Sequence, residues 1–151
     1  MMSRRFTLLL VTVLAIMLAA PAFGNSQGPP WEHNNRILVE EGCTCHGAGG
    51  SPSSEVILSI SGVPRTYVAD AEYNFTISLT HASYSSGGYM IWDYASGLLT
   101  PGDGSKEVAE SGGALSHDAP GNDWAISWTA PSEDVGDIHF SLAGNAVDGS
   151  G

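Results

Sequence analysis

Both cysteines of the chain lie one residue apart, and a histidine directly follows the second, giving Cys43, Cys45 and His46 within EEGCTCHGAGG. A c-type haem is attached when two thiols bond to its vinyl groups and an adjacent histidine coordinates the iron, and the usual sequence is C-x-x-C-H. Only Thr44 separates the cysteines here, so the spacing is one residue shorter. Glycines flank the motif and leave the backbone free to adapt. The histidine favours haem attachment, because a disulfide needs no imidazole beside it.

Two other chemistries fit the same residues. A disulfide between Cys43 and Cys45 would close a very small ring, which is strained because the Cα atoms of a disulfide prefer a separation of about 5.5–6 Å. Such a ring gains little loop entropy and suits a reducible switch better than a structural bond. Alternatively, the two thiolates and His46 could hold Cu(I) or Zn, although no second cysteine pair completes a closed site. Two thiols seldom stay free in an oxidising compartment.

A haem at this motif could take a sixth iron ligand from elsewhere in the chain. We favour His117 in the segment LSHDAPG, which is loop-like, so that its ring can turn toward a cofactor; a solvated or turn-stabilising histidine fits the same position. Met90 lies in an apolar run and fits the core better, His81 ends an expected strand, and His139 is expected to point outward. An axial pair of His46 and His117 would favour electron transfer, whereas an open position would favour ligand sensing or peroxide chemistry.

Residues 1–24 have the pattern of a secretory signal peptide. A basic start (MMSRR) precedes an apolar run (FTLLLVTVLAIMLAA), and small residues stand at Ala22 and Gly24, the positions that a signal peptidase reads. The apolar run is somewhat short for a membrane span, which needs about 20 residues. We therefore expect a mature domain that starts at Asn25, does not insert into a membrane, and works in the periplasm, at the cell surface or in the medium.

The exported part is strongly acidic. The chain has 16 Asp and Glu against 5 Lys and Arg, a net charge of −11, and Arg4 and Arg5 leave with the signal peptide. Such a polyanion excludes nucleic acid and anionic membrane surfaces as partners. The charge predicts a solubilising surface, with docking of a cationic partner as the alternative.

A β-sandwich is expected to position the motif. Residues 25–54 form an N-terminal segment with a Pro/Gly-rich lead-in, about two helical turns at 31–41 and the CTCH loop. Apolar and polar residues then alternate with period two, which is typical of strands. Strands are expected at 56–61, 73–80, 87–94, 124–128 and 138–142, with edge strands near 98–99 and 106–109. The pattern predicts an all-β, immunoglobulin-like antiparallel sandwich over 55–151, whose final stretch AGNAVDGSG ends in turn residues with no closing strand.

The order of several segments resembles a known family. These are GCTCHG, PSSEVILSISGVPRTY, AEYNFTISLTH, GGYMIWD, GLLTPGDG and LSHDAPGNDWAISWTAPSEDVGDIHFSLAGNAVDGSG. They are similar to the Reelin-N-terminal-like (reeler) β-sandwich domains of secreted bacterial and archaeal proteins, of the type called choice-of-anchor V. The resemblance implies a Cys–Cys–His element before the first strand, a histidine matching His117, and a WTAP strand. It covers about residues 42–151 and says little about chemistry.

The chain departs from this family at two places. Many relatives have two residues between the cysteines, and the last strand and anchor expected after AGNAVDGSG are absent here. These departures leave the sandwich prediction intact, but they bear on the haem motif and on attachment to the cell surface.

Taken together, the sequence predicts an exported c-type haem domain for extracytoplasmic electron transfer, with unidentified redox proteins as partners. An electron carrier or binding module is favoured over an enzyme, and hydrolase activity has no support, since no G-x-S-x-G elbow, H-E-x-x-H motif or phosphate loop occurs. The alternative is a non-enzymatic surface adhesion or interaction module, with CTCH as a disulfide or a structural Cu or Zn site. A cell-surface tether or homo-oligomer is compatible with either function.

Overall fold

The computed structural model describes residues 28, 54–94, 96–108 and 113–147. The signal peptide, the CTCH motif and the expected helical turns at 31–41 lie outside these residues. The described residues form eight strands: β1 (Val56–Ser61), β2 (Glu72–His81), β3 (Ser86–Trp92), β4 (Leu98–Pro101), β5 (Ser105–Glu107), β6 (Ala114–His117), β7 (Asp123–Thr129) and β8 (Ser141–Val147). No helix in this part of the chain is long and apolar enough to cross a membrane.

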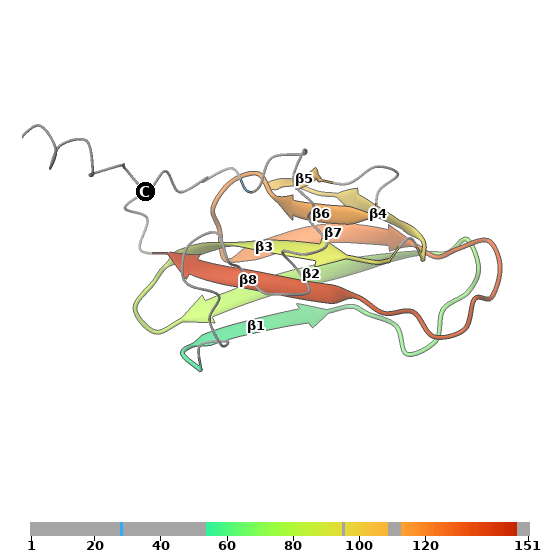
Figure 1. Cartoon of the computed structure of the whole chain (residues 1–151), viewed down its shortest axis with the longest axis horizontal. Helices are drawn as coiled ribbons and strands as arrows, with labels where there is room; N and C mark the ends of the chain where they lie inside the picture. Colours follow the sequence, from blue (N-terminus) through green and yellow to red (C-terminus); the bar gives the residue numbers. More distant parts are fainter. Residues whose placement is uncertain (1–27, 29–53, 95, 109–112, 148–151) are drawn as a thin grey trace, which may run out of the picture.

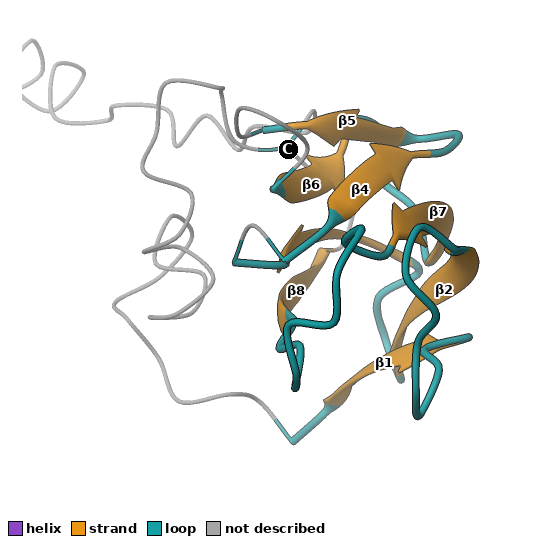
Figure 2. Ribbon diagram, turned by 90° about the vertical axis from the view of Figure 1, so that its right-hand side faces the viewer, coloured by secondary structure: helices purple, strands orange, loops and turns teal. Residues whose placement is uncertain are grey.

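The strands form two antiparallel sheets that pack face to face (Figures 1 and 2). One sheet has the order β1-β2-β7-β4 and the other β5-β6-β3-β8. Hairpin connections join β1 to β2 and β5 to β6, whereas the other connections cross between the sheets. Such crossing connections are typical of Greek-key sandwiches. The predicted all-β, immunoglobulin-like sandwich is therefore confirmed.

The core is built from the strands whose polarity alternates. In β2, Phe75, Ile77 and Leu79 are buried while the residues between them are mostly exposed, as the period-two pattern predicts. The same holds in β7, where Trp124, Ile126 and Trp128 face the core. These two strands pair in register at the centre of their sheet, so their large side chains form one continuous cluster.

Trp128 is the hub of this cluster. Its ring lies 5.8 Å from the ring centroid of Tyr73, 5.9 Å from Tyr67, 6.2 Å from Phe75 and 5.4 Å from Phe140. Stacked and edge-on aromatic pairs at these separations stabilise a core beyond simple area burial.

The other sheet has β3 at its interior. A strand was predicted at 87–94, and β3 pairs with β6 on one side and β8 on the other. Met90 is buried in it with 6% of its surface exposed, which confirms its core position. The short strands β4 and β5 lie at the sheet edges, also as predicted.

Two segments differ from the prediction. The residues before the Asp-Ala-Pro turn were expected to be a loop, but Ala114–His117 form β6 and pair with β3. The last core strand was expected at 138–142, whereas β8 spans Ser141–Val147 and so continues into the first residues of the AGNAVDGSG stretch. Gly144 explains this, because a Cβ there would lie 2.9 Å from Leu58 Cδ1 of the facing sheet. The glycine allows close sheet packing rather than a turn.

Candidate functional site

The predicted haem residues divide into two groups. Cys43, Cys45 and His46 lie outside the described residues, so their bonding stays a prediction. The histidines proposed as further ligands can be placed. Within the described ranges, no cluster of three or more His, Cys, Asp or Glu residues could jointly hold a metal ion.

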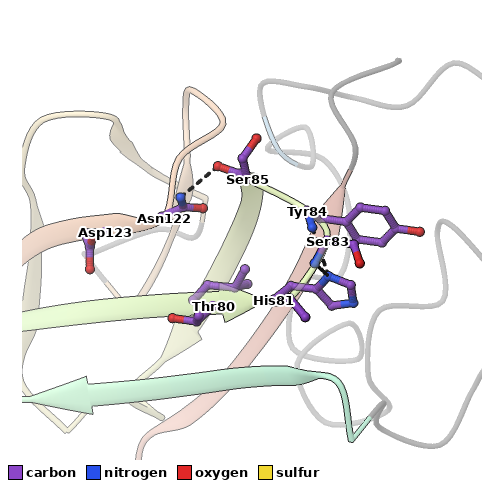
Figure 3. A pocket seen from close by; sticks show the side chains of 9 residues that line it. Thr80, His81, Ser83, Tyr84, Ser85, Asn122 and Asp123 are labelled. Atoms are coloured by element: carbon purple, nitrogen blue, oxygen red, sulfur yellow. Dashed lines mark hydrogen bonds between the residues drawn. The ribbon is translucent and has the colours of Figure 1, made fainter.

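His81 is committed to local structure at the end of β2 (Figure 3). Its Nδ1 accepts the backbone N–H groups of Ser83 and Tyr84, both at 3.0 Å, and its ring stacks on Tyr84 with centroids 4.3 Å apart. The other nitrogen, Nε2, lies 3.4 Å from Glu55 Oε2. With both nitrogens occupied, His81 serves to hold the β2–β3 loop and is a poor candidate for an iron ligand.

Two further candidates are also unsuited to binding iron. His139 is exposed, as the alternation of its segment predicted, and Ile138 and Phe140 on either side pack against the core. Met90 is buried next to Val108 and Ala114 in a second apolar cluster. An iron ligand must be accessible to the cofactor, and Met90 is instead buried in the core.

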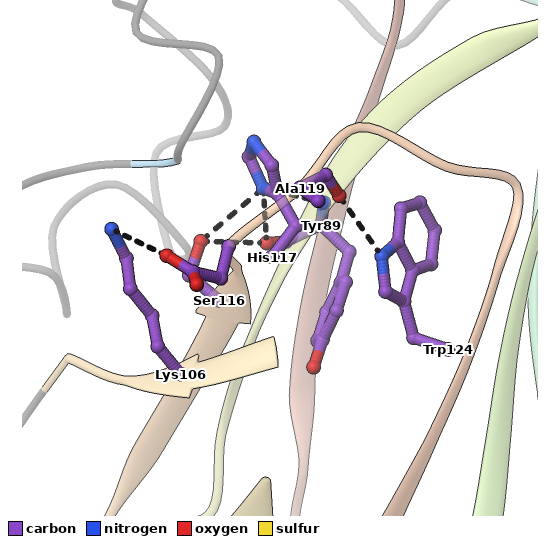
Figure 4. Close-up of polar contacts among 7 residues, drawn as sticks. Tyr89, Lys106, Ser116, His117, Ala119 and Trp124 are labelled. Carbon is purple, nitrogen blue, oxygen red and sulfur yellow. Dashed lines mark hydrogen bonds and ion pairs between the residues drawn. The ribbon is translucent and has the colours of Figure 1, made fainter. Parts of the chain in front are cut away.

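His117 ends β6 and is held against the neighbouring strand β3 (Figure 4). Its Nδ1 lies 3.2 Å from both the amide nitrogen and the carbonyl oxygen of Tyr89, and 3.3 Å from Ser116 Oγ. The fully buried Ser116 hydroxyl also donates to the Tyr89 carbonyl at 3.0 Å. One ring nitrogen is thus fixed by main chain and hydroxyl groups, which is how proteins orient a histidine whose other nitrogen binds a metal.

The His117 ring packs directly on the backbone of Gly88 in β3. A Cβ on Gly88 would lie 2.2 Å from His117 Cε1 and 2.5 Å from each ring nitrogen, closer than any real contact. Only glycine therefore lets the ring lie flat against β3. A glycine pair inside an apolar strand, Gly87 and Gly88, was the available signal of such a close approach, although the sequence alone did not say what approaches.

The N-terminal segment reaches the same place. A Cβ on Gly28 would lie 2.5 Å from the His117 carbonyl oxygen and 2.6 Å from Ser116 Oγ, so the Gly28 backbone packs directly on β6. At the other end of residues 29–53, Ser54 leads into β1, whose first residue, Val56, pairs with His81. Gly28 and the start of β1 therefore lie toward the same end of the sandwich.

Tyr89 anchors the site to the core. Its hydroxyl donates to Ser105 Oγ at 2.8 Å, and its ring lies 4.9 Å from the ring of Trp124. Burial raises the pKa of Tyr89 to about 12, and the hydrogen bond to Ser105 offsets only part of this effect. Tyr89 therefore stays protonated, and its backbone is a fixed support for His117.

Comparisons with known proteins concern the fold. No protein-family model matches the chain, and none of the curated proteins does. The solved Reelin-N domain of F-spondin matches with a TM-score of 0.50 and 19% identity, over 75% of this chain and 83% of that domain. Two human F-spondin reeler fragments give TM-scores of 0.45 and 0.46 at 18% identity, over 62% and 64% of this chain and 78% and 77% of theirs. The chain thus has a reeler-like fold.

Proposed function

We propose that this chain is an exported, reeler-like domain that carries a c-type haem and transfers electrons outside the cytoplasm. In this proposal Cys43 and Cys45 would bond the haem, and His46 and His117 would be the residues that hold its iron. The observation that carries it is the setting of His117, whose Nδ1 is fixed by Tyr89 beside the point where Gly28 packs on β6.

The chain is long enough for this arrangement. Neighbouring strands lie about 4.8 Å apart and stacked sheets about 10 Å apart. β8 packs against β1, and β6 lies two strands from β8, so about 14 Å separates β1 from β6 when the distance is taken perpendicular to the strands. The chain from His46 to Ser54 spans up to about 28 Å when extended. Its length therefore allows His46 and His117 to meet the same iron.

The setting of His117 supports this proposal. A bound haem would supply a one-electron couple, and two histidine ligands favour electron transfer over ligand binding. Ser116 and the Tyr89 backbone would keep His117 oriented, so little reorganisation would accompany a change in charge. The acidic surface would suit a cationic redox partner, because complementary charge speeds encounter.

Detection of covalently bound haem tests this proposal. The full chain is produced in a host with haem-attachment machinery, and a denaturing gel is stained for haem-dependent peroxidase activity. We expect a stained band that is lost in Cys43→Ser and Cys45→Ser variants. His117→Ala should keep the covalent haem but change the absorbance to that of a five-coordinate iron, while the exposed His139→Ala should leave it unchanged. A colourless wild-type protein would overturn the proposal.

A second function is favoured by the opposite end of the sandwich. Val68 and Val135 are 68% and 56% exposed, and Tyr67 links their loops by accepting the Val135 N–H at 2.8 Å and donating to Asp134 Oδ1 at 3.2 Å. Apolar side chains held at the surface are typical of protein contacts. A surface interaction module would use these two valines to contact its partner. If the haem test gives a colourless protein, mass spectrometry would show the state of the CTCH motif: a two-hydrogen loss for a disulfide, or the added mass of bound Cu or Zn.

A further inference from the structure

A polar hollow lies between the β2–β3 loop and the start of β7 (Figure 3). Its volume is ≈ 400 Å³, within the range of small-molecule sites. It is lined by the end of β2 and the loop that follows, from Leu79 to Ser85, and by Asn122 and Asp123. His117 is not among its lining residues, and the inference does not depend on the proposed electron transfer.

The walls of the hollow are held in place by hydrogen bonds. Asn122 donates its Nδ2 to the Ser85 carbonyl at 2.7 Å, and its own carbonyl accepts the Leu79 N–H at 2.7 Å. Asp123 Oδ1 accepts the Ser78 hydroxyl at 2.6 Å, which fixes the carboxylate. His81 holds the loop from the other side, as described above. A site whose shape is set before binding avoids the entropic cost of ordering it.

The lining groups define the ligand class. The hydroxyl groups of Thr80, Ser83 and Ser85 both donate and accept, while Asn122 and Asp123 add amide and carboxylate groups. Among the residues that the structure describes, no Lys or Arg lines the hollow, and the Asp123 carboxylate would repel an anion. This chemistry selects a neutral ligand rich in hydroxyl groups.

Tyr84 adds a flat apolar surface. It is 42% exposed, and its ring is kept in place by the stack on His81. An exposed aromatic ring beside several hydroxyl-binding groups matches a sugar, which has an apolar face of C–H groups and a rim of hydroxyls. We propose that this hollow binds a neutral saccharide, with Thr80, Asn122 and Asp123 bonding to its hydroxyls and Tyr84 covering its apolar face.

The test is an NMR titration of the full chain with the methyl glycosides of glucose, galactose, mannose and N-acetylglucosamine. We expect at least one to give saturable shifts in the amide signals of residues 82–85 and 122–123. Methyl glucuronide should bind more weakly than methyl glucoside, because its carboxylate faces Asp123. The proposal is overturned if none of the four neutral glycosides saturates, or if the glucuronide binds as well as the glucoside.

A matched pair of variants locates the site. Thr80 and Thr76 are both exposed on the same face of β2, but only Thr80 lines the hollow. Thr80→Val should weaken binding by about two- to twelvefold, the equivalent of one lost hydrogen bond. Thr76→Val should leave binding unchanged, and thermal unfolding of both variants verifies that they fold. Equal weakening by the two substitutions would place the ligand elsewhere and refute the assignment.

Discussion

Replacing Gly88 with alanine is expected to displace the His117 ring while leaving the sandwich folded. The new methyl group would lie 2.2 Å from Cε1, and the three nearest atoms to it all belong to the His117 ring. Either the His117 ring or the backbone of β3 must move to relieve this clash. The ring can rotate about its side-chain bonds, whereas β3 is held by hydrogen bonds to β6 and β8. The substitution therefore acts on the imidazole rather than on the core.

The cost follows from the contacts that the ring would lose. Nδ1 would leave the main chain of Tyr89 and the hydroxyl of Ser116. Each neutral hydrogen bond contributes about 0.5–1.5 kcal/mol, so the free energy of unfolding should fall by about 1–3 kcal/mol. In a His117→Ala background the methyl group meets no ring, and the same substitution should cost close to nothing.

Urea unfolding of the wild type, the two single variants and the double variant measures this coupling. The double variant should be more stable than the sum of the single effects predicts, by about 1–3 kcal/mol. If the changes in the free energy of unfolding of the two single variants instead add to within about 0.5 kcal/mol, Gly88 and His117 are not in contact, and the described position of the His117 ring on β3 is wrong. In the haem-loaded protein, Gly88→Ala should reproduce the absorbance change of His117→Ala.

Two predictions concern the core. Trp128→Ala should lower the free energy of unfolding by about 3–5 kcal/mol, because the ring is 1% exposed, whereas Ile57→Ser at a 65% exposed position should change it by less than about 0.5 kcal/mol; equal costs in urea unfolding would contradict the description of the core. Tyr89 should make the wild type lose stability at high pH. Because its pKa rises from 10.0 to about 12 on folding, this contribution is complete below pH 10 and is lost between pH 10 and about 12, an effect of about 2–3 kcal/mol that Tyr89→Phe should remove in the same urea assay.

Most strands were predictable because one side of each faces the core and the other faces water. Period-two alternation located β1, β2 and β7 to within one or two residues. The rule did not find β6, whose first three residues are all buried, so no polar face marks it as a strand. In β8 the core-facing residues include the small Gly144, which lies against Leu58 and Leu79 of the other sheet, so no clear apolar alternation marks the strand. Both failures arise from contacts between distant segments.

Prediction of the candidate site from the sequence was limited for the same reason. The sequence singled out His117 as a ligand, yet it did not reveal the residues that orient it, because Gly88 and Tyr89 belong to β3 and Ser116 to β6. The polar hollow was missed for a related reason, since its walls come from the β2–β3 loop and from the start of β7, which carry no motif. Residue type can identify a chemically capable group, but its supporting contacts depend on strand pairing.

The two functions considered for this chain use opposite ends of the sandwich and can therefore be tested separately. His117, Gly28 and the start of β1 lie at the end formed by the β2–β3 loop, whereas Val68 and Val135 lie on the β1–β2 and β7–β8 loops at the far end (Figure 1). The length of β2, from Glu72 to His81, separates them by about 30 Å. A substitution at Val68 or Val135 therefore does not touch His117, the proposed iron ligand, and an effect on partner binding without any change in absorbance would assign the contact to that end. In the proposed carrier, haem and partner binding need not exclude each other, because a partner would dock at one end and the haem would lie at the other.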